Sequence, residues 1–348
     1  MSTSARGIFG FFRSHPVLLL LMLSPGIPEY LTGSSAVNAI FLNPIMFLFG
    51  VAANLGLYGP GVLLIREAKV RWKKGWATVL LLGAAYGILE EGIALSTLFN
   101  PLASPVGQLG FFGHWAGVNW VWTAGIVPVH MIFSISLPIL LLGLAAPETQ
   151  GVSLLKTEKA LATTIGILFM DVFALFFLIL LGEHFFMGWP VFGLSLASIG
   201  ALIYLARKVP SNALKPKTED PAKRPLVMGL LGAAFYPTVL FIEFFGMGAK
   251  LPAIVVTPLV VLVQVMYLLY VLRIIGRSNN ERNLIALAAG LVSPLALFGI
   301  VSQISFALVL LVDATLIAFF VTLWKMYPKS VPVSPQLEES SNEVENLS

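Results

Sequence analysis

Two neighbouring glutamates, Glu90 and Glu91, lie in the otherwise apolar stretch GILEEGIAL (87–95). A histidine, His130, follows in a second apolar stretch, and Ser134 lies one helical turn beyond it. Carboxylates and imidazoles bind divalent metals, exchange protons and activate water. The residue types therefore predict a metal site, a proton relay or a buried hydrogen-bonded clasp, and leave the choice among the three open.

Composition indicates that these polar residues lie inside a membrane. The 348-residue chain is 57% hydrophobic and 11% charged, whereas a soluble domain carries about 25% charged residues. Apolar runs of about 20 residues recur without polar–apolar alternation, which predicts membrane helices and argues against a β-barrel. The absence of cysteine excludes disulfides and thiolate chemistry. The net charge of +4 is interpreted as membrane topology, with no nucleic acid as partner.

The predicted fold is all-α, a polytopic transmembrane helical bundle of about ten spans. The first span is interpreted as a retained helix and not a cleaved signal peptide, bent or broken at Pro25 and Pro28. The spans are expected at roughly 8–30, 40–65, 76–99, 117–145, 160–181, 187–206, 226–247, 252–272, 283–301 and 304–326. The predicted organisation is a six-span region (1–206) with the Glu/His site, a cytoplasmic connection (207–225), a four-span region (226–327) and a disordered tail (328–348).

Charge and tryptophan positions predict the orientation. With the N-terminus in the cytoplasm, every lysine and arginine among the 21 except Lys250 falls on the cytoplasmic side, as the positive-inside rule requires. Tryptophans mark both boundaries, as an aromatic belt does: Trp72, Trp76 and Trp324 inside, and Trp115, Trp120, Trp122 and Trp189 outside. We therefore expect both termini in the cytoplasm of a multi-pass plasma-membrane protein.

Further acids lie within the predicted spans: Glu29, Asp171, Glu243 and Asp313. A charge near the bilayer centre costs about 2.5–3.5 kcal/mol on insertion scales. Such acids need a partner, a proton, water or a cation, so we expect them to serve either function or the packing of helices. For isolated acids such as Asp171, Glu243 and Asp313, the two roles are equally supported by the sequence.

Depth brings Glu91 and His130 to a similar height. Counting about 1.5 Å per residue from the flanking tryptophans places the two within roughly 5 Å along the membrane normal, in the outer half. Gly83 and Gly87 form a G-x-x-x-G pair one turn before the glutamates, which predicts close approach of a neighbouring helix. Because consecutive helices are usually adjacent, the helix carrying His130 is the expected neighbour.

The expected catalytic set is Glu90, Glu91 and His130, with Glu91 and His130 as the metal-binding pair. A catalytic zinc site has about three protein ligands, commonly histidine with aspartate or glutamate. A divalent ion such as zinc is therefore the cofactor that this set would bind, although the sequence does not identify the third ligand.

Paired glutamates on one membrane helix and a histidine on the next resemble the CPBP (CAAX protease and bacteriocin-processing) intramembrane proteases. That family carries EExxxR, FxxxH and HxxxN motifs. Glu90 and Glu91 match the first motif, with Leu95 at its arginine position, and His130 matches the histidine of the second, with Ile126 at its phenylalanine position. No third His-x-x-x-Asn is present. The resemblance implies a hydrolase in which a glutamate activates water to cleave a membrane-embedded peptide.

A second resemblance is to a group of uncharacterised multi-spanning prokaryotic proteins. It rests on four segments: PGIPEYLTGSS (25–35), LYGPGVLLIRE (57–67), AAYGILEEGIALSTLFNP (84–101) and HMIFSISLPILL (130–141). The resemblance implies that Glu29, Glu90, Glu91 and His130 form one functional unit in a prokaryotic membrane, and it implies no particular activity.

Two alternatives to a hydrolase remain from the residues alone. Ten spans with acids near the midplane and helices interrupted by glycine and proline are also typical of a proton- or cation-coupled transporter of a small solute. A third interpretation is structural, since a buried Glu–His hydrogen bond can hold helices together.

Overall fold

The computed structural model describes residues 10–33, 43–214, 225–275, 281–302 and 306–327. The expected disordered tail (328–348) and most of the expected connection (207–225) lie outside the described residues. Where described, the chain is helical apart from loops and one short hairpin, as an all-α bundle requires. The two-stranded hairpin pairs β1 (His114–Trp115) with β2 (Val118–Asn119) antiparallel, and the end of the bundle that carries it is called the hairpin end below.

The elements follow the apolar runs of the sequence. The first half contains α2 (Pro16–Pro25), η1 (Gly26–Tyr30), α4 (Pro44–Arg71), α5 (Trp76–Gly87), η2 (Ile88–Ala94), η3 (Gly107–Gly110), α6 (Trp120–Val129), η4 (His130–Ser136), α7 (Leu137–Ala145) and η5 (Pro147–Thr149). The second half contains α8 (Glu158–Gly182), α9 (Trp189–Lys208), α10 (Pro225–Gly248), α11 (Ala253–Ile275), α12 (Glu281–Ser302) and α13 (Phe306–Met326). Of these, η1, η2 and η4 are π-helical and η3 and η5 are 3-10 turns.

Nine helices in the described part of the chain are long and apolar enough to cross a membrane, and the segment Pro16–Tyr30 is a shorter apolar helix. This agrees with the prediction of a helical membrane protein of about ten spans. The expected break in the first span is wrong, because the helix continues through Pro25 and Pro28 by widening into the π turn η1. Within η1 the bond from Leu31 N–H to Gly26 O spans five residues, as in a π turn.

Two span boundaries differ from expectation in ways that matter for the site. The third span ends at Ala94, not at residue 99, and the fourth begins at Trp120, not at residue 117. Residues 95–119 instead form a connection at the hairpin end, which is buried where it follows η2, at residues 96–100. The Asn119 N–H donates to Leu98 O at 2.8 Å, so the end of this connection is hydrogen-bonded to its beginning.

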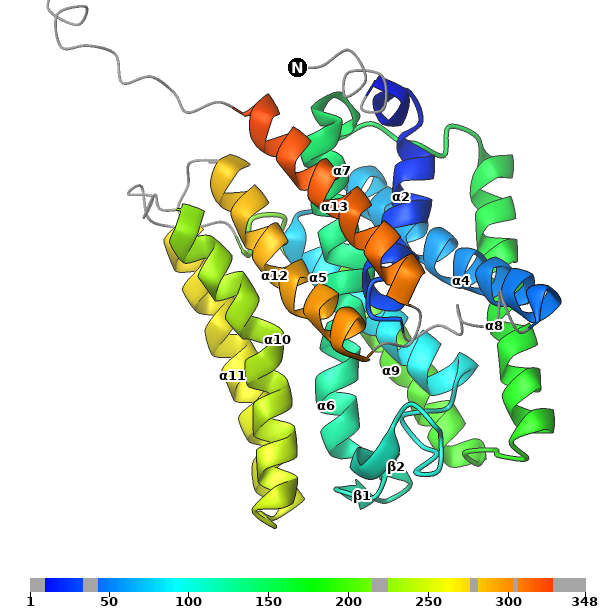
Figure 1. Cartoon of the computed structure of the whole chain (residues 1–348). Helices are drawn as coiled ribbons and strands as arrows, with labels where there is room; N and C mark the ends of the chain where they lie inside the picture. The colour runs from blue at the N-terminus through cyan, green and yellow to red at the C-terminus, as the bar shows by residue number, and fades with distance from the viewer. Residues whose placement is uncertain (1–9, 34–42, 215–224, 276–280, 303–305, 328–348) are drawn as a thin grey trace, which may run out of the picture.

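Burial separates an inner from an outer set of helices. In their apolar windows, 72% of the residues of α5–η2 are buried and 56% of those of α6–α7, against 6% for α8 and 11% for α9. Figure 1 shows α10 and α11 paired on one side of the bundle, α8 on the opposite side, and α5 and α6 between them. The polar residues of α5, η2 and η4 are therefore at the centre of the molecule.

The predicted G-x-x-x-G contact is present between α5–η2 and α6–η4. A Cβ atom at Gly83 would lie 3.1 Å from the backbone of Met131, and one at Gly87 would lie 3.1 Å from Val127 O and 3.4 Å from His130 Cβ. Glycine at both positions lets the two backbones approach closely enough for side chains beyond Gly87 to reach His130.

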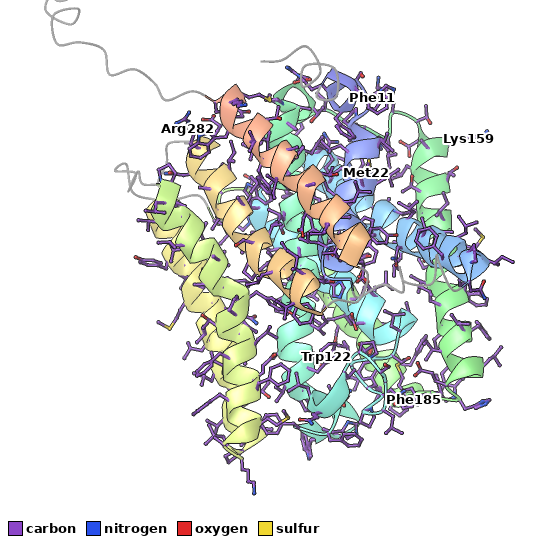
Figure 2. The ribbon with its side chains drawn as sticks, in the orientation of Figure 1. Phe11, Met22, Trp122, Lys159, Phe185 and Arg282 are labelled. Atoms are coloured by element: carbon purple, nitrogen blue, oxygen red, sulfur yellow. The ribbon has the colours of Figure 1, made fainter. Side chains whose placement is uncertain are left out.

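The far end of the bundle, opposite the hairpin, carries the basic residues. Figure 2 places the labelled Lys159 and Arg282 there, with Trp122 and Phe185 toward the hairpin end. At this basic end Arg66 and Glu67 are buried and form an ion pair of 2.9 Å. Arg66 also donates to Thr149 O, and Leu154 N–H donates to Glu67, so the loop that contains η5 covers the pair.

Candidate functional site

Each of the three π-helical turns carries polar residues that the sequence singles out. The turn η1 contains Glu29, η2 contains Glu90 and Glu91, and η4 contains His130 and Ser134. A π turn is rare, costs favourable hydrogen-bond geometry and is found frequently at functional sites. The three turns lie in separate helices, and η4 contacts both η1 and the α5 helix that leads into η2.

His130 bridges the two glutamates through both ring nitrogens. Its Nε2 lies 2.8 Å from Glu91 Oε1, and its Nδ1 lies 3.0 Å from Glu90 Oε2. All three side chains are buried, with residue exposures of 1% for Glu90, 6% for Glu91 and 2% for His130. The expectation that Glu91 and His130 lie at similar depth is thereby confirmed, and Glu90 joins them.

The π turn explains how two adjacent glutamates reach one ring. Neighbouring residues of an α-helix point about 100° apart, which would direct the two carboxylates to different neighbours. In η2 the bond from Leu95 N–H to Glu90 O, 2.9 Å, spans five residues. The wider turn brings consecutive side chains closer in direction, so Glu90 and Glu91 face His130 together.

Ser134 lies on the same face as His130, as the spacing predicts. Its Oγ is 3.1 Å from His130 Nδ1. Its backbone carbonyl accepts a 2.6 Å hydrogen bond from Ser24, whose hydroxyl also lies 3.2 Å from Tyr58 O. Ser24 thus ties α2 and α4 to the turn that carries the histidine.

The connection after η2 returns to the site and holds Glu91 from the hairpin end. The hydroxyl of Thr97 donates to Glu91 Oε2, and the indole N–H of Trp122 donates to Thr97 Oγ1 at 3.2 Å. Asn119 donates to Thr97 O at 2.7 Å. Both oxygens of Glu91 are therefore engaged, one by His130 and the other by Thr97.

Glu29 approaches the opposite side of the site through Tyr58. The Tyr58 hydroxyl donates to Glu29 Oε1 at 2.6 Å, and its ring centroid lies 6.1 Å from that of His130. Tyr58 is buried and its hydroxyl also lies within reach of Glu90. The grouping of Glu29 with the other three residues is consistent with this geometry, with Tyr58 as the intermediate.

The remaining in-membrane acids do not join this cluster. Asp171 on α8 lies against Gly56 of α4, where a Cβ atom would be 2.9 Å from its Oδ1. Glu243 on α10 lies against Gly125 of α6. Asp313 on α13 is buried. Each of the three acids has one buried carboxylate oxygen with no hydrogen-bond partner among the described residues.

The sequence had not marked three residues of the site: Tyr58, Tyr86 and Trp122. Tyr58 and Tyr86 are both fully inside apolar helices and lie beside Glu90. A tyrosine at mid-span is a usable signal, because its hydroxyl requires a partner in hydrocarbon. Trp122 had been interpreted only as a boundary residue, and nothing in the sequence shows that it donates to Thr97.

Glu90, Glu91 and His130 are also arranged as ligands. One ligand atom from each lies within 4.8 Å of the others, and this is the His/Asp/Glu group of the described residues that could hold a metal ion. Zinc binds histidine nitrogen at about 2.0–2.1 Å and carboxylate oxygen at about 2.0–2.2 Å, so ligand atoms lie about 3–4 Å apart around an ion. Small side-chain rotations bring the three atoms into that range.

Comparison of the chain with models of known protein families, with curated proteins and with solved structures gives no match. The arguments for function therefore rest on the geometry of the site.

Proposed function

We propose that the protein is an intramembrane hydrolase in which Glu91 and His130 hold a divalent metal ion and Glu90 is the base. The observation that carries the proposal is the imidazole of His130 held between two buried carboxylates, at 2.8 Å and 3.0 Å. Three polar groups at the centre of an apolar bundle are expensive to retain unless they are used. The resemblance of the EE…H pattern to CPBP proteases supports the same chemistry.

The two ring nitrogens of His130 suggest different roles for the two glutamates. An ion on Nε2 would have His130 and Glu91 as ligands, which are the metal-binding pair expected from the sequence. Ser134 Oγ, 3.1 Å from Nδ1, would then be the outer partner that metal-bound histidines usually have, and Glu90 would remain available as the base for water. Thr97 and Trp122 orient the second oxygen of Glu91, so both ligands would be fixed before an ion binds.

The proposed reaction is hydrolysis of a peptide bond. A divalent ion supplies polarisation of water and of the scissile carbonyl. Glu90 accepts a proton from the attacking water as the new carbon–oxygen bond forms. The same proton passes to the departing nitrogen when the carbon–nitrogen bond breaks, so that the products are one carboxylic acid and one amine.

A membrane-embedded peptide is the proposed substrate class. The site lies among helices that are apolar and long enough to span a bilayer. A cavity of about 380 Å³ beside η1, lined almost wholly by apolar side chains of α2, α4 and α13, also contains Tyr30, the neighbour of Glu29. Apolar side chains of a substrate would fit such surroundings, whereas a polar solute would lose its hydration there.

The proposed location is the plasma membrane of a prokaryote, with both termini in the cytoplasm. The distribution of lysine and arginine supports this orientation. It would place the hairpin end, with residues 95–119, on the outer side and the site in the outer half of the membrane.

A coupled transporter is the second candidate, favoured by the buried and unpartnered oxygens of Asp171 and Asp313. Carboxylates inside a membrane bundle are typical of proton pathways. In that function Glu90, Glu91 and His130 would exchange protons or bind the coupling cation, and the protein would hydrolyse nothing.

Metal analysis of the purified full chain tests the hydrolase proposal. After incubation with Zn²⁺ and removal of free ion, we expect about one ion per chain for the wild type, because Glu91 and His130 form one site. Glu91→Gln and His130→Ala should lose the ion. Glu158→Gln is the matched control, because Glu158 has a side chain 84% exposed, and it should retain the ion. Equal and negligible zinc in all four proteins would refute the metal site.

A second measurement separates hydrolysis from transport. Proteoliposomes containing total membrane peptides are incubated in H₂¹⁸O, and new peptide carboxyl termini are analysed for ¹⁸O. The hydrolase predicts ¹⁸O-labelled termini with wild type and none with Glu90→Gln. Bound zinc without labelled termini would favour the transporter.

A further inference from the structure

Three buried polar atoms without a hydrogen bond among the described residues occur on α8, on α5 and on η2, and η2 packs against both of these helices. They are Asp171 Oδ2, Tyr86 Oη and Glu90 Oε2. Glu90 Oε2 lies 3.0 Å from His130 Nδ1, but in a geometry that is not a hydrogen bond. Most buried polar atoms in proteins have a partner, so three such atoms on elements that pack together require an explanation.

Glycines in α4 allow these residues to approach. The carboxylate of Asp171 occupies the space beside Gly56, where a Cβ atom would lie 2.9 Å from Asp171 Oδ1. The ring of Tyr86 lies over Gly61, where a Cβ atom would be 2.3 Å from the ring edge. A larger residue at either glycine would displace one of the two polar side chains.

Tyr86 interacts with both acids. It precedes Glu90 by four residues along α5 and η2 and therefore lies on the same side of the helix. It interacts electrostatically with Glu90 and with Asp171, and the residue is 3% exposed. The hydroxyl can donate one hydrogen bond and accept two, and the carboxylates supply acceptors.

We propose that Asp171, Tyr86 and Glu90 form an internal hydration site that holds ordered water next to the Glu90 side of the His130 cluster. A buried water typically makes about three hydrogen bonds to polar groups that lack other partners. Two carboxylate oxygens and one hydroxyl provide that number and the right mixture of donor and acceptors.

The role of the hydration site rests on the proposed function: it would store the water that hydrolysis consumes. The cluster is almost completely buried, so a hydrolase of this design needs water close to its base. Glu90 is the residue shared by the two sites. Asp171 and Tyr86 are not part of the proposed catalytic group, and they would act by binding water.

Radiolytic hydroxyl-radical labelling of the purified full chain tests the site directly. Radicals arise from water, so a buried side chain is oxidised when ordered water adjoins it. Met228 provides the buried baseline, because it is 0% exposed although methionine is readily oxidised; Trp115, 72% exposed, provides the accessible reference. We expect Tyr86 to be labelled well above Met228 in the wild type. Labelling of Tyr86 as low as that of Met228 would overturn the proposal.

Two substitutions at Asp171 determine whether this residue shares the site. Asp171→Leu has a similar size but no polar atoms, and it should lose most of the Tyr86 label. Asp171→Asn keeps the capacity to bind water and should retain the label. An unchanged Tyr86 label in Asp171→Leu would overturn the assignment. If that variant does not fold, the wild-type comparison still decides.

The outcomes also separate this proposal from the proposed function. Labelled Tyr86 in a protein that binds no zinc would retain the hydration site and reject the hydrolase. Bound zinc with unlabelled Tyr86 would retain the metal site and reject the water store.

Discussion

The hydrogen bond from Thr97 to Glu91 offers the sharpest test of how the site is held. Thr97→Val preserves the shape of the side chain and removes its hydroxyl. That hydroxyl donates to Glu91 Oε2 and accepts from Trp122 Nε1. Thr97 and Glu91 are both buried, at 3% and 6% exposure, so water cannot easily replace the lost donor.

The expected loss of unfolding free energy is about 2 kcal/mol. A hydrogen bond to a charged group contributes about 1.5–3 kcal/mol in water-soluble proteins, whereas bonds between membrane helices average about 0.6 kcal/mol. The Thr97 bond should fall nearer the first range, because it joins a folded connection to a carboxylate. The substitution also leaves one acceptor, Glu91 Oε2, and one donor, the Trp122 indole N–H, without this partner. A loss of about 1.4 kcal/mol already corresponds to a tenfold change in the folding equilibrium.

Unfolding by sodium dodecyl sulfate in mixed micelles, monitored by circular dichroism, measures this loss. The matched control is Thr322→Val on α13, because the Thr322 hydroxyl donates to Ala318 O of its own helix and Thr322 is not buried. The control should change stability by less than about 0.5 kcal/mol, as is usual for surface positions. Equal effects of the two substitutions would refute the inference that Thr97 fixes Glu91.

Three other predictions follow from packing and charge. Gly87→Ala should destabilise the protein by about 1–3 kcal/mol, because its Cβ would press on the helix carrying the histidine. The control Gly193→Ala has open space around it and should be neutral or stabilising by up to about 1 kcal/mol. The same unfolding assay compares the two variants. Arg66→Met should cost about 1.5–3 kcal/mol, because it removes one of the two arginines that pair with buried Glu67, while Arg71 remains at 3.3 Å. Reduced yield of folded protein in size-exclusion chromatography would be a second sign. The hydrogen-bonded guanidinium of Arg13 lowers the pKa of the Glu148 carboxyl, so above the ordinary glutamate pKa this exposed pair stabilises the fold by no more than about 1 kcal/mol. The stabilisation is lost as pH falls through the lowered pKa. The melting-temperature difference between wild type and Glu148→Gln should therefore vanish at low pH, and a difference that grows on acidification would contradict this.

Sequence patterns were sufficient to predict the helices and the contact between Glu91 and His130. Apolar runs and tryptophan positions are spaced by the thickness of a bilayer, so depth can be counted along a helix. The pair Gly83 and Gly87 likewise predicted which helix faces would touch. These features depend on local geometry that each segment carries by itself.

The π turns, and the hydrogen bond from Thr97 back to Glu91, were not predictable in the same way. A π turn of five to seven residues leaves no repeating pattern, and its wider bonding is stabilised by contacts made after the helices pack. The end of the third span at Ala94 also depends on such contacts, since Asn119 and Trp122 hold Thr97. The burial of Arg66 and Glu67 was likewise not predictable, because only the folded loop around η5 removes them from water.

The burial of Glu90 and Glu91 in adjacent positions has a consequence for how the chain enters the bilayer during synthesis. Two charged glutamates would add about 5–7 kcal/mol to the cost of inserting the helix that contains them, more than its apolar residues readily offset. The helix carrying His130 lacks that burden and provides the partner that lowers it. We therefore expect the segment 76–94 to be retained at the translocation machinery until the segment 120–145 has emerged, so that the two enter the membrane as a pair.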